Sequence, residues 1–234
     1  MSKPRPTHSI ESLNVYWREL YQNRPMLAAE NLPGLELNAA LNKPAFVREK
    51  NWVPSPASGV QRILLERQGG ELTKRATSLV AYQANSRFNA HTHPLGEEFL
   101  VLAGVFSDEY GDYPAGTYVR NPPASSHSPF TKQGCLILVK LQQMPVDDCQ
   151  RIVTNALQQA SGEQMLFNDY EKVSMLTSSH EPVHSQTQEG LVLQGSAQVA
   201  GQTLQVGDWF RYSNEQAITL APNSLVFSKR EHLS

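Results

Sequence analysis

Two kinds of hydrophobic pattern follow one another along the chain. Between residues 9 and 22, apolar side chains recur at helical spacing, and Ser9 can cap the first turn. From about residue 35 onwards, short runs rich in Val, Ile, Leu, Phe and Tyr alternate with clusters of Gly, Pro, Asn and Ser. Many short strands separated by turn signals are typical of a β-sandwich or β-barrel. We therefore expect an all-β protein that begins with one short helix packed on its core.

One later segment has two interpretations. Asp147 and Asp148 can cap a helix over residues 147–160, and this helix is our prediction. The sequence RIVTN within the same segment is also typical of a strand, so the strand stays open as the alternative.

An internal repeat sets the organisation of the chain. Matching residues recur at a constant separation of 91 positions in one ungapped window. The pairs are His93 with His184, Glu98 with Glu189, Leu100-Val101-Leu102 with Leu191-Val192-Leu193, Gly104 with Gly195, Gly116 with Gly207, and Arg120 with Arg211. We interpret the two halves as duplicated β domains.

Composition and charge narrow the class of protein. With 40% hydrophobic and 18% charged residues, the 234-residue chain is neither disordered nor membrane-like. A formal net charge of −2 without any basic cluster argues against a nucleic-acid partner. The N-terminal residues lack the apolar region of a signal peptide, and Cys135 and Cys149 form no CxxC motif. We expect a cytoplasmic protein with free thiols and no membrane contact.

Candidate metal ligands are concentrated in HTHPLGEE. His91 and His93 are one residue apart, so a strand places both rings on one face, and Glu97 follows a Pro-Leu-Gly turn. His127 comes after the next glycine-punctuated block. Three imidazoles and one carboxylate suit zinc, iron(II), manganese or nickel. We predict that these four residues bind one divalent metal, rather than being solvated turn residues, and that Glu98 points away from it.

The stretch HTHPLGEEFLVLAGVFSDEYGDYPAGTYVRNPPASSHSPF resembles the cupin domain of the ChrR-like family, named after an anti-sigma factor. The resemblance continues through RATSLVAYQANSRF and GCLILVKLQQM and covers about residues 35–145. It implies two tandem cupin domains, each a double-stranded β-helix or jelly roll, and a metal, with zinc favoured. We accordingly divide the chain into a helical segment at 1–30, a metal-binding cupin at 31–145 and a degenerate cupin at 146–234.

The chain departs from the family pattern at two places. The type member has an N-terminal anti-sigma domain with its own His and Cys zinc motif, and nothing similar occurs here, so we do not expect sigma-factor binding. The second repeat keeps only one of the four ligands, and we expect it to bind no metal and to serve as a structural or dimerising half. Its aligned positions are Pro182 for His91, His184 for His93, Gln188 for Glu97, and Ile218 for His127.

Inward-facing side chains near the metal are candidates for a small-molecule pocket. Phe88, Phe99, Val101 and Tyr118 are our pocket-lining candidates, and ordinary core packing is the alternative for them. Arg120 recurs in the half without a metal site, which favours a structural role. For Cys135 we expect a buried, unreactive thiol rather than a redox sensor.

Three functions fit this site, namely a sensor, an enzyme, and a purely structural or partner-binding protein whose metal holds the fold together, and the sequence does not decide whether the protein is an enzyme. The resemblance to ChrR implies a regulatory role in sensing oxidative stress, which is our first interpretation. The alternative is an iron(II) dioxygenase acting on a small chelating substrate, although the only candidate general base is the inferred ligand Glu97. We expect a small-molecule ligand and a homodimer as partners.

Overall fold

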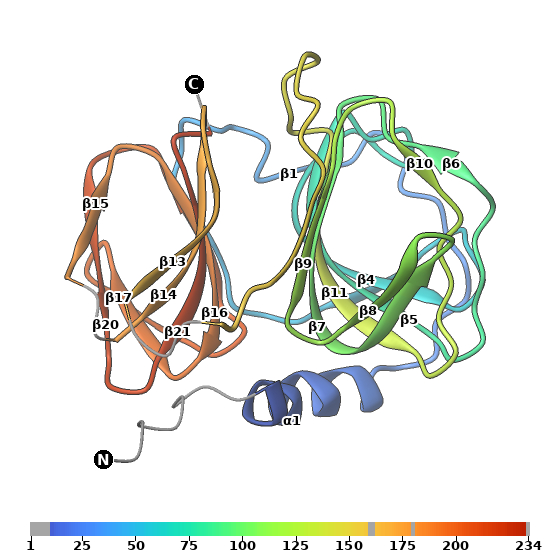
Figure 1. Ribbon diagram of the computed structural model, residues 1–234, viewed down its shortest axis with the longest axis horizontal. Coiled ribbons are helices and arrows are strands. Elements are labelled where there is room, and N and C mark those ends of the chain that lie inside the picture. Colours follow the sequence, from blue (N-terminus) through green and yellow to red (C-terminus); the bar gives the residue numbers. More distant parts are fainter. Residues whose placement is uncertain (1–9, 159–161, 179–180, 233–234) are drawn as a thin grey trace. The chain divides into compact units, whose positions relative to one another are not determined.

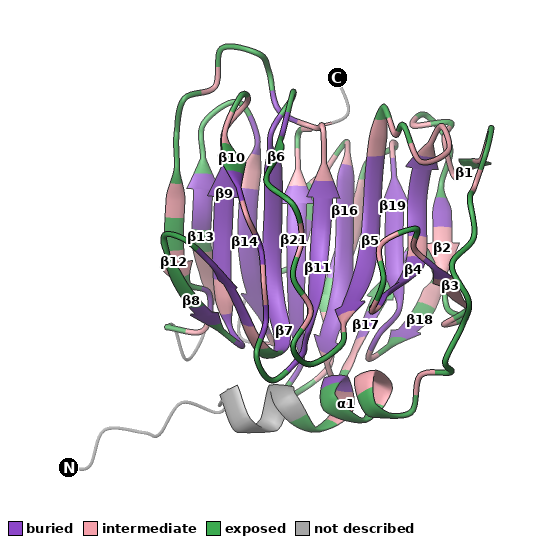
Figure 2. Cartoon of the chain, turned by 90° about the vertical axis from the view of Figure 1, so that its right-hand side faces the viewer, coloured by how far each residue is buried: buried purple, intermediate pink, exposed green. Residues whose placement is uncertain are grey.

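The computed structural model describes residues 10–158, 162–178 and 181–232. Within these residues the secondary structure consists of one helix and twenty-one strands, so the all-β prediction is confirmed. Burial is concentrated in the strands, whereas most connecting loops are exposed (Figure 2). Among the described residues, no helix combines the length and apolarity that crossing a membrane requires.

The chain divides into two compact units. We call Asn14–Ala39 with Lys50–Asn155 the N-terminal barrel, and Ala40–Glu49 with Ala156–Ser234 the C-terminal barrel. Helix α1 (Ile10–Gln22) confirms the predicted N-terminal helix within the described residues.

The N-terminal barrel is built from antiparallel strands (Figure 1). Nine of them form a sheet in the order β1-β4-β5-β11-β7-β9-β12, with β3 added to β4 and β8 added to β7. Strands β6 and β10 form a separate two-stranded sheet. The strands are β1 (Glu36–Leu37), β3 (Trp52–Pro54), β4 (Val60–Gln68), β5 (Arg75–Tyr82), β6 (His91–Thr92), β7 (Glu97–Asp108), β8 (Gly111–Pro114), β9 (Thr117–Asn121), β10 (Ser126–His127), β11 (Cys135–Leu141) and β12 (Ile152–Asn155).

Alternation along these strands creates the core of the N-terminal barrel. Because successive side chains point to opposite faces, Phe99 and Val101 on β7 and Val119 on β9 share the inner face. They pack with Ile137 and Val139 of β11, and all five side chains are almost fully buried. This layer of aliphatic and aromatic side chains forms the hydrophobic core of the barrel.

The C-terminal barrel repeats the antiparallel plan. A six-stranded sheet has the order β13-β14-β21-β16-β19-β2, and a four-stranded sheet has the order β15-β20-β17-β18. The strands are β2 (Ala45–Val47), β13 (Glu163–Asn168), β14 (Lys172–Thr177), β15 (Val183–Ser185), β16 (Gln188–Gln194), β17 (Ser196–Val199), β18 (Gln202–Gln205), β19 (Trp209–Tyr212), β20 (Gln216–Leu220) and β21 (Leu225–Arg230).

The internal repeat is visible in the strand registers. Glu98 pairs with Arg120 between β7 and β9, and their counterparts Glu189 and Arg211 pair between β16 and β19. Residues at a separation of 91 positions therefore occupy equivalent places in the two barrels, which supports the interpretation of a duplication.

The helix predicted over residues 147–160 is wrong for the described part, and the alternative strand is correct. Ile152–Asn155 forms β12, which pairs along its length with Thr117–Arg120 of β9. The pairing partner lies more than thirty residues away in sequence, so local capping residues could not reveal it.

The two units differ from the continuous segments expected from the sequence. Ala40–Glu49 lies within the segment 31–145 but belongs to the C-terminal barrel, because β2 extends the sheet there by pairing with β19. At the other boundary, β12 lies beyond residue 145 but belongs to the N-terminal barrel.

Candidate metal centre

The four predicted ligands come from neighbouring stretches of the N-terminal barrel. His91 on β6 and His127 on β10 are direct partners in the two-stranded sheet. His93 follows β6, and its amide donates a hydrogen bond of 2.9 Å to the carbonyl of Ser125. Glu97 is the first residue of β7. The short β6–β10 pairing thus brings residues from both ends of a 37-position span, 91 to 127, to one place.

The turn between His93 and Glu97 depends on Gly96. Its φ of 75° lies in the left-handed region that favours glycine. A Cβ atom at Gly96 would also collide with the side chain of Met144. The glycine therefore lets the chain reverse tightly enough for Glu97 to face the imidazole of His93.

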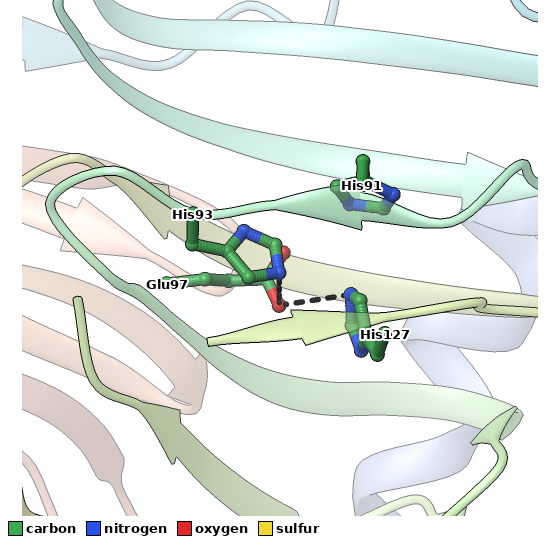
Figure 3. A group of neighbouring side chains, drawn as sticks. All are labelled: His91, His93, Glu97 and His127. Carbon is green, nitrogen blue, oxygen red and sulfur yellow. Dashed lines mark ion pairs between the residues drawn. The ribbon is translucent and has the colours of Figure 1, made fainter. Parts of the chain in front are cut away.

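The ligand atoms of these four residues converge. One candidate ligand atom from each of His91, His93, Glu97 and His127 lies within 4.8 Å of all the others. In Figure 3 the rings of His93 and His127 approach the Glu97 carboxylate from two sides. The distances from Glu97 Oε2 are 3.6 Å to His93 Nε2 and 3.5 Å to His127 Nε2. The structure thus brings together all four residues that the sequence singled out.

These residues fit a bound divalent metal. The Nε2 atoms of His93 and His127 are buried and have no hydrogen-bond partner within the described part of the chain. Buried polar atoms without a partner are rare in folded proteins, because leaving one unsatisfied costs about 1–3 kcal/mol. A metal between the imidazoles and the carboxylate would satisfy these atoms, and three histidines with one glutamate are an ordinary ligand set for first-row metals.

The two buried imidazoles have different environments. Burial lowers the pKa of His93, because desolvation penalises its charged form more than the nearby Glu97 stabilises it. Burial also acts to lower the pKa of His127, but the hydrogen bond to Asp108 and the charge of Glu97 outweigh this effect and raise it. His93 is thus the imidazole held more readily in the neutral, metal-binding form.

Backbone and side-chain contacts orient the other two ligands. Nδ1 of His91 lies 3.1 Å from the carbonyl oxygen of Asn89, which can only accept, so Nδ1 donates and Nε2 keeps its lone pair. Nδ2 of Asn121 donates a hydrogen bond of 3.3 Å to Glu97 Oε2. Such contacts around a ligand fix its orientation.

Sequence reasoning missed two side chains that contact a ligand, Asn121 beside Glu97 and Asp108 beside His127. Asp108 Oδ2 lies 3.2 Å from Nδ1 of His127, on the side of the ring away from Glu97. Asp108 ends β7 and His127 lies on β10, so their meeting depends on how the barrel closes rather than on a local spacing. The internal repeat carries a signal that could have identified Asp108, because its counterpart in the second copy is Val199.

A cavity of about 250 Å³ opens beside the metal ligands. His91, His93 and Glu97 lie in its wall, together with the polar side chains of Arg62 and Gln142. The apolar part of its wall includes two prolines and several aromatic and branched side chains, namely Pro94, Pro129, Val60, Val80, Tyr82, Phe88, Phe106, Val139 and Leu141. A largely apolar cavity with a few polar groups is typical of small-ligand sites.

The four pocket-lining candidates have different positions. Phe88 lines the cavity. Phe99 and Val101 belong to the core of the barrel and are not among the cavity-lining residues, which matches the core-packing alternative. The assignment of Tyr118 is corrected, because its buried hydroxyl donates a hydrogen bond of 2.7 Å to Glu98 Oε2. Tyr118 and Glu98 point away from the inner face that Phe99 occupies.

Glu98 and Arg120 are structural, as expected from their recurrence in both halves. Nη1 of Arg120 lies 3.2 Å from Glu98 Oε2, and Nη2 lies 2.7 Å from Asp148 Oδ2. All three side chains are almost fully buried. A buried arginine requires such carboxylate partners, since an unpaired buried charge is strongly destabilising.

The two cysteines are free thiols in different surroundings. Cys135 is buried, and burial raises the pKa of its thiol to about 12. Because the thiolate is the reactive form, Cys135 is unreactive at neutral pH, as the sequence interpretation expected. Cys149 is exposed.

The described part of the C-terminal barrel contains no second cluster of His, Cys, Asp and Glu comparable to this one. His184, the counterpart of His93, is exposed on β15, and its neighbour across the sheet is Ala217. His180, a further candidate ligand there, lies outside the described residues. Absence of metal from this barrel stays a prediction.

Comparison with known proteins shows which folds and which domain family the chain is similar to. None of the curated proteins matches the chain. Among solved structures, Ylba from E. coli, of the DUF861 family, is 16% identical with a TM-score of 0.61, covering 93% of this chain and 97% of its own. A candidate dioxygenase from Nostoc punctiforme is 11% identical (TM-score 0.60, 86% and 87% covered). The nickel(II) complex of the pirin YhhW from E. coli is 13% identical (TM-score 0.60, 80% and 98% covered).

These structural likenesses show a shared fold and no more, because the sequence identities are low. The sequence itself indicates a domain family, since a family model described as the ChrR cupin-like domain matches residues 44–145. The match includes all four residues of the candidate metal centre. The chain thus has the cupin fold, and its residues 44–145 match the ChrR cupin-like domain.

Proposed function

We propose that the N-terminal barrel is a metal-dependent oxygenase that binds a small, largely apolar substrate through oxygen atoms. The single observation that carries the proposal is the cavity of about 250 Å³ that opens directly on three of the four converging ligands. A purely structural metal would not need a cavity of this size beside it. When bound, iron(II) at these residues would supply positions for a chelating substrate and for dioxygen.

The walls of the cavity suit an aromatic or branched aliphatic substrate. Phe88 and Phe106 pack edge-on against the ring of Tyr82, and this arrangement gives the cavity a rigid aromatic side. Burial raises the pKa of Tyr82 well above its ordinary value, so its phenol stays neutral and can donate a hydrogen bond to a substrate oxygen. These residues would bind and orient the substrate and exclude water from it.

Arg62 provides a fixed cationic group at the cavity wall. Its Nη1 and Nη2 atoms each donate a hydrogen bond of 2.9 Å to the carboxylate of Glu71. Nη2 also donates a hydrogen bond of 2.7 Å to the carbonyl of Pro54. Because Glu71 offsets its charge, Arg62 favours a polar, uncharged part of a substrate over a free carboxylate.

The side chains of the cavity wall also indicate which type of reaction the site can support. Glu97 is the only carboxylate among the described side chains of the cavity wall, and it is an inferred ligand. Reactions that depend on a separate carboxylate base, such as many hydrolyses and isomerisations, lack that group here. This supports oxygen chemistry over proton-transfer chemistry.

A regulatory role in sensing oxidants is the second candidate, and the match of residues 44–145 to the ChrR cupin-like domain favours it. In this role zinc would hold the ligand stretches together, and oxidation of a ligand or loss of the metal would change the fold. A small-molecule ligand and a homodimer are partners compatible with both candidates. Sigma-factor binding is not part of either proposal.

Reconstitution with defined metals separates the two candidates. Protein freed of metal is reloaded anaerobically with Fe²⁺, Zn²⁺, Ni²⁺ or Mn²⁺, and oxygen consumption is measured with β-diketones and flavonoids. The oxygenase proposal predicts substrate-dependent oxygen uptake with Fe²⁺. It also predicts that Glu97→Gln lowers the uptake at least about tenfold, since even contacts around a ligand contribute that much.

His184→Ala is the matched control, because it removes the equivalent histidine from the C-terminal barrel and should leave uptake unchanged. Tight zinc binding without oxygen uptake at any metal would instead support the regulatory candidate and overturn the oxygenase proposal.

A further inference from the structure

The carboxylate of Asp108 is held by a complete set of hydrogen bonds. Its Oδ1 accepts from the hydroxyl of Tyr113 at 2.9 Å and from the amides of Tyr110 at 2.8 Å and Gly111 at 3.2 Å. Its Oδ2 faces Nδ1 of His127 at 3.2 Å. With three donors on one oxygen, the carboxylate has no freedom to rotate away from the imidazole.

The hydrogen-bond network around Asp108 extends through Tyr113 to Arg151. Nη2 of Arg151 donates a hydrogen bond of 3.2 Å to the hydroxyl of Tyr113, and its guanidinium lies 5.2 Å from the ring centre of Tyr110. Because this hydroxyl accepts from Arg151, its own proton is directed to Asp108. A chain of hydrogen bonds therefore runs from Arg151 through Tyr113 and Asp108 to His127.

This chain selects one tautomer of the imidazole. An ionised carboxylate only accepts hydrogen bonds, so Nδ1 of His127 must carry the proton when it bonds to Asp108. Nε2 then bears the lone pair, and Nε2 is the atom that lies 3.5 Å from Glu97 and has no hydrogen-bond partner within the described residues. The opposite tautomer would direct an N–H at the place where a metal binds.

The second copy of the repeat shows that these residues change together. The positions equivalent to Asp108, Tyr113 and His127 are Val199, Leu204 and Ile218, all of which are buried in the core of the C-terminal barrel. Val199 and Ile218 are direct partners between β17 and β20. Where the ligand histidine is replaced by an apolar residue, the residues that support it are apolar as well, so the support has no use without the ligand.

We propose that Asp108 is a positioning residue of the metal centre, which fixes the tautomer and ring orientation of His127 and is itself held by Tyr113 and Arg151. The inference rests on the metal centre of the proposed function but not on the reaction, so it holds equally for an oxygenase and for a regulatory zinc site.

The first test uses Asp108→Asn, which keeps the shape and the acceptor Oδ1 but presents an N–H₂ group to His127. The imidazole must then accept at Nδ1 and protonate Nε2, which removes its ligand lone pair. We expect the affinities for Zn²⁺ and Co²⁺, measured by competition with a chelator, to fall about 10–100-fold. The visible absorption of the Co²⁺ form should change, while the melting temperature of the metal-free protein should stay near that of the wild type.

Asp112→Asn is the matched control, because Asp112 lies on the same hairpin but its Oδ1 accepts from Ser107 and not from a ligand. It should leave both affinity and absorption unchanged. An Asp108→Asn protein with wild-type affinity and an unchanged Co²⁺ spectrum would overturn the proposal.

The second test needs no variant of Asp108 and no activity. Long-range ¹⁵N–¹H correlations on the metal-free wild-type protein report which imidazole nitrogen carries the proton, and His127→Gln identifies the signals of His127. We expect protonation at Nδ1. Protonation of the neutral imidazole at Nε2 would overturn the proposal even if the protein proved to be an active oxygenase, whereas Nδ1 protonation without oxygen uptake would leave it standing and refute only the proposed reaction.

Discussion

At the scale of single residues, three of the four metal ligands follow from local sequence, whereas His127 and the residue that supports it, Asp108, do not. His91, His93 and Glu97 lie within seven positions, so strand alternation and one glycine turn suffice to predict that they meet. Asp108 meets His127 only because β7 and β10 are brought together by the closed barrel. Closure of a barrel depends on many strand pairings, so it cannot be predicted from the spacing of individual residues along the chain.

The cysteines give a prediction that distinguishes thiol-based from metal-based sensing. Because the thiol of Cys135 is buried with a pKa of about 12, we expect it not to react with a thiol reagent such as DTNB at pH 8. The exposed Cys149 should react readily, so the native protein should release about one equivalent of chromophore and the denatured protein about two. Rapid reaction of both thiols in the native protein would contradict the buried position of Cys135.

At the scale of elements, strand pairing decides what local pattern leaves open. The segment containing β12 has helix-capping aspartates, yet it forms a strand because β9 offers an unpaired edge. Tyr118 has the character of a pocket residue, but the register of β9 against β7 turns it to the outer face beside Glu98. Both outcomes depend on strands distant in sequence. The sequence therefore predicted the central strands of the barrel better than its edge strand and the face to which a side chain points.

Strand β2 provides a prediction at this scale. Phe46 of β2 packs against the core of the C-terminal barrel and pairs with Phe210. Removing its ring by Phe46→Ala should cost about 2–4 kcal/mol, since the side chain is only partly buried. Hydrogen exchange should therefore accelerate in β19 and β14, while β11 in the N-terminal barrel keeps its protection and the metal content stays unchanged.

Phe88→Ala is the comparison variant, because Phe88 is also partly buried but belongs to the N-terminal barrel. It should leave exchange in β19 and β14 unaltered. Faster exchange in β11 than in β19 after Phe46→Ala would contradict the assignment of β2 to the C-terminal barrel.

At the scale of the whole molecule, the two halves share a frame and differ in chemistry. The pairs Glu98–Arg120 and Glu189–Arg211 occupy equivalent registers in the two barrels. Only the first copy brings three histidines and a glutamate together within the described residues. The repeat was predictable because matching residues recur at one constant separation along the sequence. Residues that both copies share maintain the barrel, whereas residues that only the first copy has form the metal centre.

The most direct test of the account is the metal content of the purified protein and its histidine variants, measured by elemental analysis. We predict about one divalent metal per chain for the wild type and for His184→Ala. His93→Ala and His127→Ala should each retain less than about a tenth of this amount, because each variant loses one of the four ligands, a buried imidazole. Full metal content in His93→Ala, or loss of metal in His184→Ala, would contradict a single metal centre in the N-terminal barrel.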